Sequence, residues 1–399
     1  MRNHILFIVE NNSVPRDVRV WGEALAAKEF GYDVSVICPR DVTFDKRGNY
    51  IDGIRIYTHP LLLEGNGKIS LILEYANALF WEFLLSLRVF IQNKFNILHG
   101  ANPPDHVFLI ALFFKVFGVK FIFDHHDIAP ENYIAKFGKR GFFYSALLIM
   151  ERLTFKTADL VISTNESYKK VAMERGRIKE NNIFVVRNGP NLSRIRVGKP
   201  NQKLRDGFKY LVGYVGIIAQ QEGIENLLHV IDYIVNVKKR NDIKFIIVGR
   251  GPHLEAVIKM SQDLKLEKYA WFTGYISDKA LYEILSTVDV CVNPEFTNEF
   301  TNRSTMIKIM EYMTFAKPIV QHFTTEGEVT AGGAAIYINK NSEIEFAEAL
   351  LQLLEDPSQR ERMGREGRRR IEDFLNWDRQ KIRLREAYKQ LEIENGQRL

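Results

Sequence analysis

The sequence predicts an α/β protein of two domains, each built around a doubly wound parallel sheet, and three observations carry this prediction. Short runs rich in isoleucine, valine and phenylalanine alternate with segments of helical periodicity, which is typical of parallel strands covered by helices on both faces. The alternation stops in a polar stretch with several glycines and prolines, residues 188–208, and then starts again. The length, 399 residues, suits two large domains.

The predicted strands form two series. The first comprises residues 5–9, 34–38, 97–99, 121–123, 160–163 and 183–186, and the second comprises 211–215, 245–248, 271–273, 288–292 and 319–320. We therefore expect an N-terminal domain at 1–190, a linker at 191–208, a second domain at 209–372, and a helix at 373–399 that packs back towards the first domain. Doubly wound sheets bind ligands outside the carboxyl ends of their strands, so we expect the site in a cleft that both domains face.

Composition and charge exclude several classes of protein. With 46% hydrophobic and 26% charged residues, the chain is neither disordered nor fibrous. Its excess of 55 − 49 = 6 basic residues is too small to indicate a nucleic-acid partner. Cys38 and Cys291 lie in separate apolar runs, which favours buried thiols and a reducing compartment. The first residues predict a strand rather than a signal peptide, so we expect a cytoplasmic location.

The longest apolar stretch, residues 69–91, is interrupted by charged and amide side chains such as Glu82 and Arg88. A bilayer core tolerates such residues poorly, so the stretch predicts a buried or interfacial helix and not a membrane span.

Two glycine turns follow predicted strands of the second domain. Gly216 precedes a helix with apolar residues over 224–234, and Gly249, Arg250 and Gly251 follow the next strand. A glycine turn that leads into a helix N-terminus suits a phosphate, because backbone N–H groups and the helix dipole favour negative charge. Close packing of the turns explains the same glycines equally well, so both interpretations stay open.

The segment at residues 298–320 combines a helix start with polar side chains. Ser304 or Thr305 is a natural N-cap, and the helix that follows carries Lys308 and Glu311 three residues apart. This arrangement can hold a diphosphate at the helix tip and sugar hydroxyls beside it. A surface ion pair is the alternative interpretation.

These stretches resemble the family 4 glycosyltransferases of the GT-B fold, retaining enzymes with two Rossmann-like domains that use nucleotide-sugar donors. The resemblance rests on VENNSVPRDVRVWGEA, FDHHDIAPE, VVRNGPNL, GYVGIIAQQEGIENLL, FIIVGRGP, FTGYISDKALYEILSTVDVCVNP and STMIKIMEYMTFAKPIV, which lie over residues 9–320 in the order of the family. It implies that Glu311 binds the nucleotide ribose and that His126 contacts the transferred sugar.

The chain departs from the family pattern at the donor diphosphate. The first glutamate of the pair spaced eight apart is replaced by Arg303, and the family's arginine and lysine are replaced by Ile217 and Glu222. Buried phosphate charge needs cations, so we expect Lys308 and Arg303 to substitute, with Arg250 or Arg187 in reserve. The full predicted donor set comprises Gly216, Arg187, Asn188, Gly249, Arg250, Gly251, Tyr275, Arg303, Ser304 and Thr305 beside the catalytic residues His126, Lys308 and Glu311.

On the N-terminal side, the strand at 121–123 runs into Asp124-His125-His126-Asp127. Titratable residues in succession at a strand end are uncommon in a core, so we expect them at the site. A metal site is a rival interpretation, but no further paired histidine or cysteine completes one, and we expect none. The predicted acceptor-side residues are Arg16, Arg19, Asn102, Asp127 and Glu131.

Taken with the resemblance, these residues predict a retaining, metal-independent transferase without a cofactor. Its donor is a nucleotide sugar, its acceptor is a glycan or a lipid-linked sugar, and its product is a cell-surface polysaccharide or glycolipid. Basic and aromatic residues interleave over 136–156 and basic residues recur over 169–179, which favours peripheral contact with an anionic inner-leaflet surface; a solvated face is the alternative. A non-catalytic nucleotide- or glycan-binding partner and a nucleotide-sugar epimerase remain as alternatives. No GxGxxG follows the first strand, which disfavours a dehydrogenase.

Overall fold

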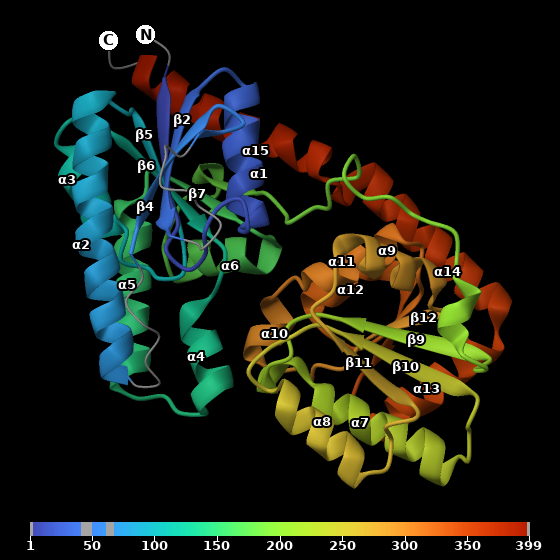
Figure 1. Ribbon diagram of the computed structural model, residues 1–399. Helices are drawn as coiled ribbons and strands as arrows, with labels where there is room; N and C mark the ends of the chain where they lie inside the picture. Colours follow the sequence, from blue (N-terminus) through green and yellow to red (C-terminus); the bar gives the residue numbers. More distant parts are fainter. Residues whose placement is uncertain (1–2, 41–49, 61–67, 397–399) are drawn as a thin grey trace. The chain divides into compact units, whose positions relative to one another are not determined.

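The computed structural model describes residues 3–40, 50–60 and 68–396 (Figure 1). The chain divides into two compact units. The first comprises Met1–Asn188 with Gln380–Leu399, and the second comprises Gly189–Arg379. Residues 191–208, predicted as a linker, therefore belong to the second unit, where the Gly198 amide donates to Ser286 Oγ at 3.0 Å. The cleft between the two domains stays a prediction.

The first unit contains an eight-stranded sheet in the order β3-β4-β2-β1-β5-β6-β7-β8. All neighbouring strands are parallel except β3 and β4, which pair antiparallel. The strands are β1 (His4–Ile8), β2 (Asp33–Pro39), β3 (Tyr50–Ile51), β4 (Ile54–His59), β5 (Ile97–Ala101), β6 (Lys120–His125), β7 (Leu160–Ser163) and β8 (Ile183–Val185). Helices α1 (Val18–Glu29), α2 (Lys68–Gln92), α3 (Phe108–Lys115), α4 (Ala129–Phe137), α5 (Phe142–Thr157) and α6 (Glu166–Glu174) connect them.

The second unit contains a six-stranded parallel sheet in the order β11-β10-β9-β12-β13-β14. Its strands are β9 (Tyr210–Val215), β10 (Ile243–Val248), β11 (Ala270–Gly274), β12 (Val290–Asn293), β13 (Ile319–His322) and β14 (Ala335–Ile338). Its helices are α7 (Ile224–Asp232), α8 (Leu254–Asp263), α9 (Asp278–Thr287), α10 (Glu299–Arg303), α11 (Ile307–Thr314), α12 (Thr325–Ala331), α13 (Glu343–Glu355) and α14 (Pro357–Arg370). Helix α15 (Trp377–Gly396) begins in the second unit and ends in the first.

Each sheet has a topological switch point, where the chain reverses the direction in which it adds strands. In the first unit the switch lies between β1 and β5, and in the second it lies between β9 and β12. Doubly wound sheets bind ligands at the carboxyl ends of the strands at this point. The topology therefore directs attention to the segments that follow β1, β5, β9 and β12.

The cores follow from apolar strands covered on both faces. All five residues of β1 are buried, as a strand between two layers of helices requires. Helix α7 buries Ile224, Leu227, Leu228 and Ile231, the apolar stripe that the sequence indicates, against one face of the second sheet. Cys38 and Cys291 are buried and form no disulfide, as predicted.

Every strand predicted from the sequence is present, and β3, β4 and β14 were missed. Strand β4 reads IRIYTH, in which Arg55 and Thr58 interrupt the apolar residues, and β14 is only four residues long, AIYI. Their signal is weak because β4 is not a continuous apolar run and because β14, at the sheet edge, buries one residue of its four.

The N-cap prediction for the helix at 298–320 is wrong. Two helices occupy this segment: α10 starts at the N-cap Asn298, and Ser304 is its C-cap, with the Ser304 hydroxyl donating to the Phe300 carbonyl at 2.8 Å. Helix α11 has Met306 as its N-cap, with no side-chain hydrogen bond there. Asn298 and Thr301 form a capping box that starts α10 several residues before the predicted N-cap. Ser304 therefore ends a helix where the sequence predicts that one begins.

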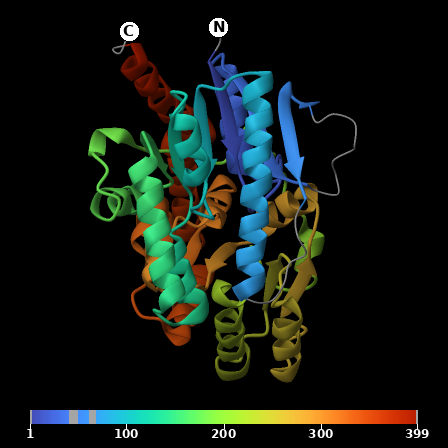
Figure 2. The same cartoon turned by 90° about the vertical axis from the view of Figure 1, so that its left-hand side faces the viewer.

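The apolar stretch predicted as a helix is α2 (Figure 2). In the part of the chain that the structure describes, no helix has the length and hydropathy needed to cross a membrane.

Candidate functional site

A buried charged cluster lies at the carboxyl edge of the first sheet, with Arg19 at its centre. Arg19 Nη2 donates to Asp124 Oδ1 at 2.7 Å, and Arg19 Nε donates to His126 Nε2 at 2.7 Å. The remaining donor, Nη1, reaches the Val186 carbonyl and Asn188 Oδ1, each at 2.7 Å. Helix α1 positions Arg19 through its N-cap Asp17, which accepts from the Val20 amide. The arginine thus joins β6, β8 and α1 at one point.

The charges of this cluster are largely balanced within it. Burial opposes ionisation of Asp124, but the Arg19 guanidinium and His126 together hold the pKa of Asp124 well below its ordinary value. Glu23, one turn after Arg19 and 3.1 Å from it, is fully buried, and burial raises its pKa well above the ordinary value. His126 is the most accessible of these side chains, at 14% exposure against 7% for Arg19 and 0% for Asp124. It is therefore the group of this cluster that can meet a ligand.

Three predicted acceptor-side residues are occupied by internal contacts. Asn102 uses all four of its hydrogen-bonding positions: its Nδ2 donates to Asp105 and to the Asp127 carbonyl, and its Oδ1 accepts from the His126 and Asp127 amides. Asp127 accepts from Asn132 at 2.9 Å. These bonds fix the backbone that carries His126, so Asn102 positions the loop.

Glu131 forms a bidentate pair with Arg175, at 2.8 and 3.2 Å. Arg175 also pairs with the buried Glu151, and Lys169 pairs with Glu180 at 2.8 Å. The run of basic residues over 169–179, predicted as a membrane-facing surface, is therefore partly neutralised by acids from elsewhere in the fold. For Arg175 the prediction is wrong, because its charge is directed into the unit.

His125 packs in the core, contrary to the expectation that the successive polar residues gather at the site. Its ring lies 5.1 to 5.4 Å from the rings of Phe123, Phe155 and Tyr168. Burial lowers its pKa to about 3, so the ring is neutral. Alternation along β6 turns Asp124 and His125 to opposite faces of the sheet.

In the second unit, the ammonium of Lys308 lies between two carboxylates at the switch point. Lys308 Nζ is 2.7 Å from Glu222 Oε2 and 2.7 Å from Glu295 Oε1, and it donates to the Tyr214 hydroxyl at 3.2 Å. Glu222 belongs to the turn after β9, Glu295 follows β12, and Lys308 opens α11. Two acids thus face one cation at the place where the sequence predicts a diphosphate site.

Burial sets the protonation of this group. It raises the pKa of Glu295 to about 7, opposed by the charge of Lys308 and reinforced by Glu222. The neighbouring acids hold the pKa of Lys308 well above its ordinary value despite its burial, so it remains a cation. The group can therefore carry a net charge of −1 or, with a proton on Glu295, of zero.

Glu311 lies one turn further along α11 and is half-buried. Its carboxylate makes no hydrogen bond or ion pair with any residue that the structure describes. Burial raises its pKa, Lys308 lowers it and Asp278 raises it. A carboxylate placed in this way has both oxygens available to accept hydrogen bonds from hydroxyls.

The glycine turns are packed against one another. A Cβ on Gly249 would lie 1.8 Å from the Gly216 carbonyl oxygen, and one on Gly251 would lie 2.2 Å from the Ile218 carbonyl oxygen. The amides of Gly216 and Ile218 donate to the Val248 and Arg250 carbonyls. Close packing therefore accounts for these glycines, and the amides of Gly216 and Ile218 are used inside the fold.

The remaining predicted donor residues lie in different surroundings. Arg250 is exposed and its guanidinium lies 5.0 Å from the ring centroid of Tyr275, which is 75% exposed. Arg303 ends α10, and Thr305 donates weakly to Glu326 at 3.5 Å. The other three, Arg187 and Asn188 of the predicted donor set and Arg16 of the acceptor set, belong to the first unit.

Sequence reasoning missed Glu23, His99 and Glu295. His99 Nε2 lies 3.4 Å from Glu23 and 3.5 Å from Asp124, while its Nδ1 contacts the Tyr388 hydroxyl at 3.0 Å. Glu23 is inside a helical pattern and Glu295 follows a proline, so neither stands out in the sequence. A polar residue within a buried strand was the available signal for His99.

Two doubly wound units with charged groups at their switch points define the class of GT-B glycosyltransferases. The family model described as Glycosyltransferase Family 4 matches residues 17–194, and the model described as Glycosyl transferases group 1 matches residues 209–356. Together they cover both halves of the chain, which belongs to the family 4 glycosyltransferases.

Individual proteins resemble the chain to different extents. The capsular polysaccharide biosynthesis glycosyltransferase CapM of Staphylococcus aureus is 26% identical over 246 residues, 59% of this chain and 62% of the relative. The match thus spans less than two thirds of that relative. The sucrose-phosphate synthase of Thermosynechococcus elongatus is 16% identical with a TM-score of 0.78, over 98% of this chain and 100% of that one. Anabaena HepE in complex with UDP-glucose is 15% identical with a TM-score of 0.72, over 97% and 99%. These structures have the same fold.

Proposed function

We propose that this chain transfers a sugar from a nucleotide-sugar donor to a glycan or lipid-linked sugar, with retention at the anomeric carbon, in the synthesis of a cell-surface polysaccharide or glycolipid. Family membership supports the reaction class. The similarity to CapM, whose name refers to capsular polysaccharide, supports the product class. The fold shared with HepE, which was solved with UDP-glucose, supports a nucleotide-sugar donor.

The observation that carries the proposal is the carboxylate of Glu311 at the switch point of the second unit. It has no partner among the described residues, it is half-buried, and it lies one turn from a retained cation. A ribose presents two adjacent hydroxyls, which a carboxylate can accept with its two oxygens. Glu311 then fixes the nucleoside while its diphosphate extends towards Lys308.

The diphosphate needs positive charge that the Lys308 group does not supply as it stands. Protonation of Glu295 removes one of the two negative charges opposite Lys308, and its pKa of about 7 makes this change accessible near neutral pH. Arg250, exposed at the end of β10, supplies a second cation. We propose that Lys308, a protonated Glu295 and Arg250 replace the cations absent at Ile217 and Glu222.

Departure of the nucleoside diphosphate builds negative charge on its oxygens and cationic character on the sugar. Cations held in place beforehand stabilise this charge without a metal ion at the diphosphate. No protein nucleophile is required, because the acceptor hydroxyl can pass its proton to the leaving phosphate. His126 contacts the transferred sugar, and Arg19 and Asp124 hold its ring in position.

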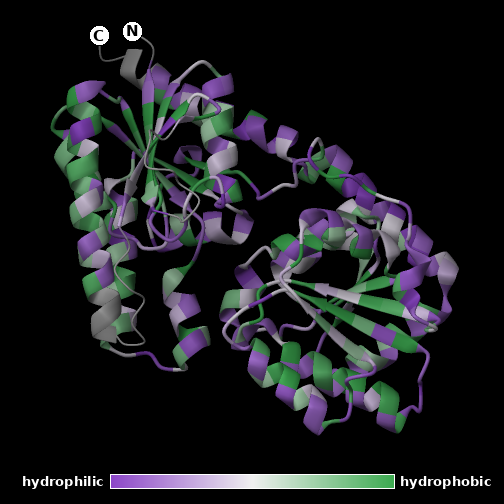
Figure 3. Cartoon of the chain, in the orientation of Figure 1, coloured by the Kyte–Doolittle hydropathy of each residue, from purple (hydrophilic) through white to green (hydrophobic). Residues whose placement is uncertain are grey.

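Membrane contact is part of the proposal, and it rests on the surface of the first unit. Residues 135–142, from the last turn of α4 to the first residue of α5, are exposed throughout. They include Lys136, Lys139, Phe137 at 55% and Phe142 at 82% exposure. Helices α2 and α3 contain many hydrophobic residues (Figure 3). Several of their apolar side chains are exposed, including Phe80 and Leu112, and the two helices line a groove of about 320 Å³. Its lining residues are Ala76, Leu79, Phe80, Phe83, Leu109 and Ile110. Apolar side chains next to cations suit an anionic lipid surface, where a lipid-linked acceptor is found.

A two-stage experiment tests the transfer reaction. Thermal-shift measurements with nucleoside diphosphates and nucleotide sugars identify the donor, because a ligand of the folded state raises its stability. Release of nucleoside diphosphate is then measured with and without acceptor glycolipids. Release that requires the acceptor and is lost in Glu311→Gln supports the proposal. Nucleotide binding without release would instead indicate the non-catalytic partner.

Membrane contact is tested separately by cosedimentation with vesicles of phosphatidylglycerol and phosphatidylcholine. We expect Phe142→Ser and the Lys136→Ala/Lys139→Ala pair to lower the bound fraction severalfold. Arg365→Ala/Arg369→Ala, on exposed residues of the second unit, serves as the matched control for lost charge. Equal binding by all variants would contradict this surface.

A further inference from the structure

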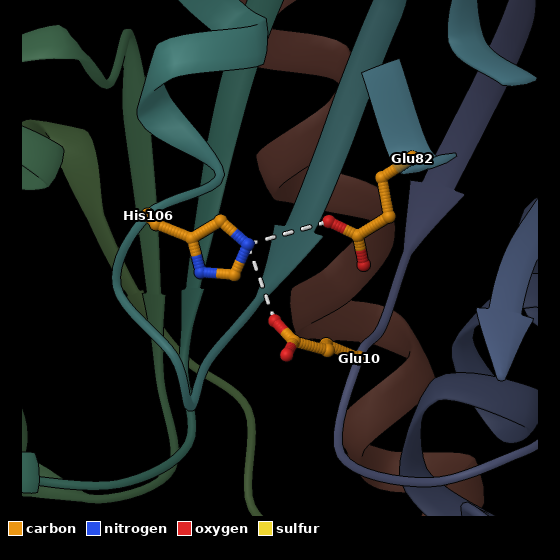
Figure 4. A group of neighbouring side chains, drawn as sticks. All are labelled: Glu10, Glu82 and His106. Carbon is orange, nitrogen blue, oxygen red and sulfur yellow. Dashed lines mark ion pairs between the residues drawn. The ribbon is translucent and has the colours of Figure 1, made fainter. Parts of the chain in front are cut away.

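Glu10, Glu82 and His106 form a second buried group in the first unit, apart from the Arg19 cluster (Figure 4). Glu10 follows β1, His106 follows β5, and Glu82 comes from α2. Glu10 and His106 therefore follow the two strands that flank the switch point. The side chains are 6%, 1% and 8% exposed, respectively for Glu10, Glu82 and His106.

The contacts within this group are not ordinary hydrogen bonds. His106 Nε2 lies 3.2 Å from Glu10 Oε2 and 3.5 Å from Glu82 Oε2. Neither contact has hydrogen-bond geometry: both ring nitrogens of His106 and one oxygen of each glutamate lack a hydrogen-bond partner among the described residues. Figure 4 shows both carboxylates directed at the same ring nitrogen. Buried polar atoms without partners are rare and call for an explanation.

The charges of the Glu10 group also call for an explanation. Glu82 and Glu74 are the charged groups that act most strongly on Glu10, and both are acids. The Arg19 cluster, the other described group in which acids and a histidine come within 4.8 Å of one another, contains a guanidinium that balances its acids. Two buried acids are costly unless a cation lies beside them, so a bound cation would stabilise the Glu10 group.

We propose that Glu10, Glu82 and His106 bind one divalent transition-metal ion of the Mn²⁺ to Zn²⁺ class. Such ions accept one imidazole nitrogen and two carboxylate oxygens. Ligand atoms about 2.1 Å from a metal lie about 3.0 Å apart at neighbouring octahedral positions and about 3.4 Å apart in a tetrahedron. The two measured separations, 3.2 and 3.5 Å, are of this size.

The surroundings resemble those of ligands held for a metal. The His106 ring stacks on Tyr75, with centroids 6.0 Å apart and an angle of 26°. His59 Nε2 lies 3.9 Å from the other oxygen of Glu82, where it can orient that carboxylate. Three protein ligands leave coordination positions for water or for an oxygen of a ligand at the carboxyl edge of the sheet. This site does not depend on the proposed transfer reaction, and it differs from the metal-free expectation drawn from the sequence.

Metal content and thermal unfolding of the full chain test the proposal. After treatment with chelator, the protein is dialysed against Zn²⁺, Mn²⁺, Mg²⁺ or Ca²⁺ in turn, and bound metal is measured by mass spectrometry. We expect one Zn²⁺ or Mn²⁺ per chain, a rise of a few degrees in Tm, and little response to Mg²⁺ or Ca²⁺. Glu82→Gln and His106→Gln should each weaken binding more than tenfold.

The variant Glu10→Gln distinguishes a bound metal ion from a shared proton as the explanation of this buried group. In chelator, this variant removes repulsion between buried acids, so its Tm should equal or exceed that of the unchanged protein; in Zn²⁺ the order should reverse. Glu23→Gln, which alters the Arg19 cluster, should retain one bound ion. An unchanged protein that binds no Zn²⁺ or Mn²⁺ beyond the amount bound by Glu10→Gln would overturn the proposal and leave a shared proton as the explanation.

Discussion

Lys308 and Glu222 are 86 residues apart in the sequence, and their side chains form a 2.7 Å ion pair at the switch point of the second unit. Glu222 occupies a position where the family resemblance implies a lysine. The cation is thus present in this chain, but it comes from α11 and is shared between Glu222 and Glu295. This arrangement keeps the positive charge and makes its availability depend on protonation.

Replacement of Lys308 by methionine should affect both stability and binding. It leaves two acids facing each other, and we expect the second unit to lose about 3 kcal/mol of unfolding free energy. Nucleotide affinity and turnover should fall by roughly tenfold to a thousandfold, as for a lost charged phosphate contact. In the double variant Lys308→Met/Glu295→Gln, stability should recover while binding stays weak. Unchanged affinity and turnover in Lys308→Met would remove Lys308 from the site.

Glu295 should make nucleotide binding dependent on pH. Its pKa is raised to about 7 in the folded state, above an unfolded value of about 4.3, so its contribution to stability is full below about pH 4.3 and is lost as the pH rises through 7. Lys308, Glu222 and Tyr214 are the charged or titratable groups that face it. A bound diphosphate favours the protonated form further, so affinity should fall between pH 6 and 8. Calorimetry in buffers of different ionisation enthalpy should show proton uptake that Glu295→Gln abolishes; uptake that persists in this variant would assign the proton elsewhere.

Glu311→Gln should weaken nucleotide-sugar binding by about tenfold to a hundredfold, because it replaces a charge-assisted acceptor by a neutral one. Stability should change little, since the carboxylate has no partner to lose within the described chain. Titration calorimetry measures the affinity, and Glu361→Gln on the exposed surface of α14 is the matched control. Equal affinity in the two variants would contradict contact between Glu311 and the ribose.

His126→Ala should lower turnover by about a hundredfold while nucleotide affinity stays within about twofold, because the ring meets the transferred sugar and not the nucleotide. Steady-state kinetics and nucleotide titration separate these two effects. His125→Phe tests the neighbouring ring, which packs among aromatic side chains, and should leave turnover intact. Loss of nucleotide affinity in His126→Ala would place the ring elsewhere in the reaction.

Gly249→Ala should destabilise the second unit by more than about 2 kcal/mol. The added Cβ would clash with the Gly216 carbonyl oxygen, and the backbone has φ of 145°, which L side chains rarely adopt. Gly141 has no atom within 4 Å of such a Cβ, so Gly141→Ala is the matched control. Chemical denaturation of both variants measures the difference, and equal stabilities would show that the turn can relax.

The sequence by itself determined the strands that consist of continuous apolar runs, and with them the two sheets. A strand that is buried on both faces needs apolar residues at consecutive positions, as β1 and β10 have. It also predicted site residues in the segments after these strands, including His126, Lys308 and Glu311. Strand β4 escaped because polar residues interrupt its apolar run.

Only the tertiary structure decided which polar residues meet. The neutralisation of Lys308 by Glu222 and Glu295, the core position of His125, and the group formed by Glu10, Glu82 and His106 all join residues from separate elements. The local sequence indicates whether a side chain is buried, through the spacing of hydrophobic residues around it. The charged partner of a buried side chain comes from a segment that is distant in the sequence. A local sequence pattern therefore does not identify that partner.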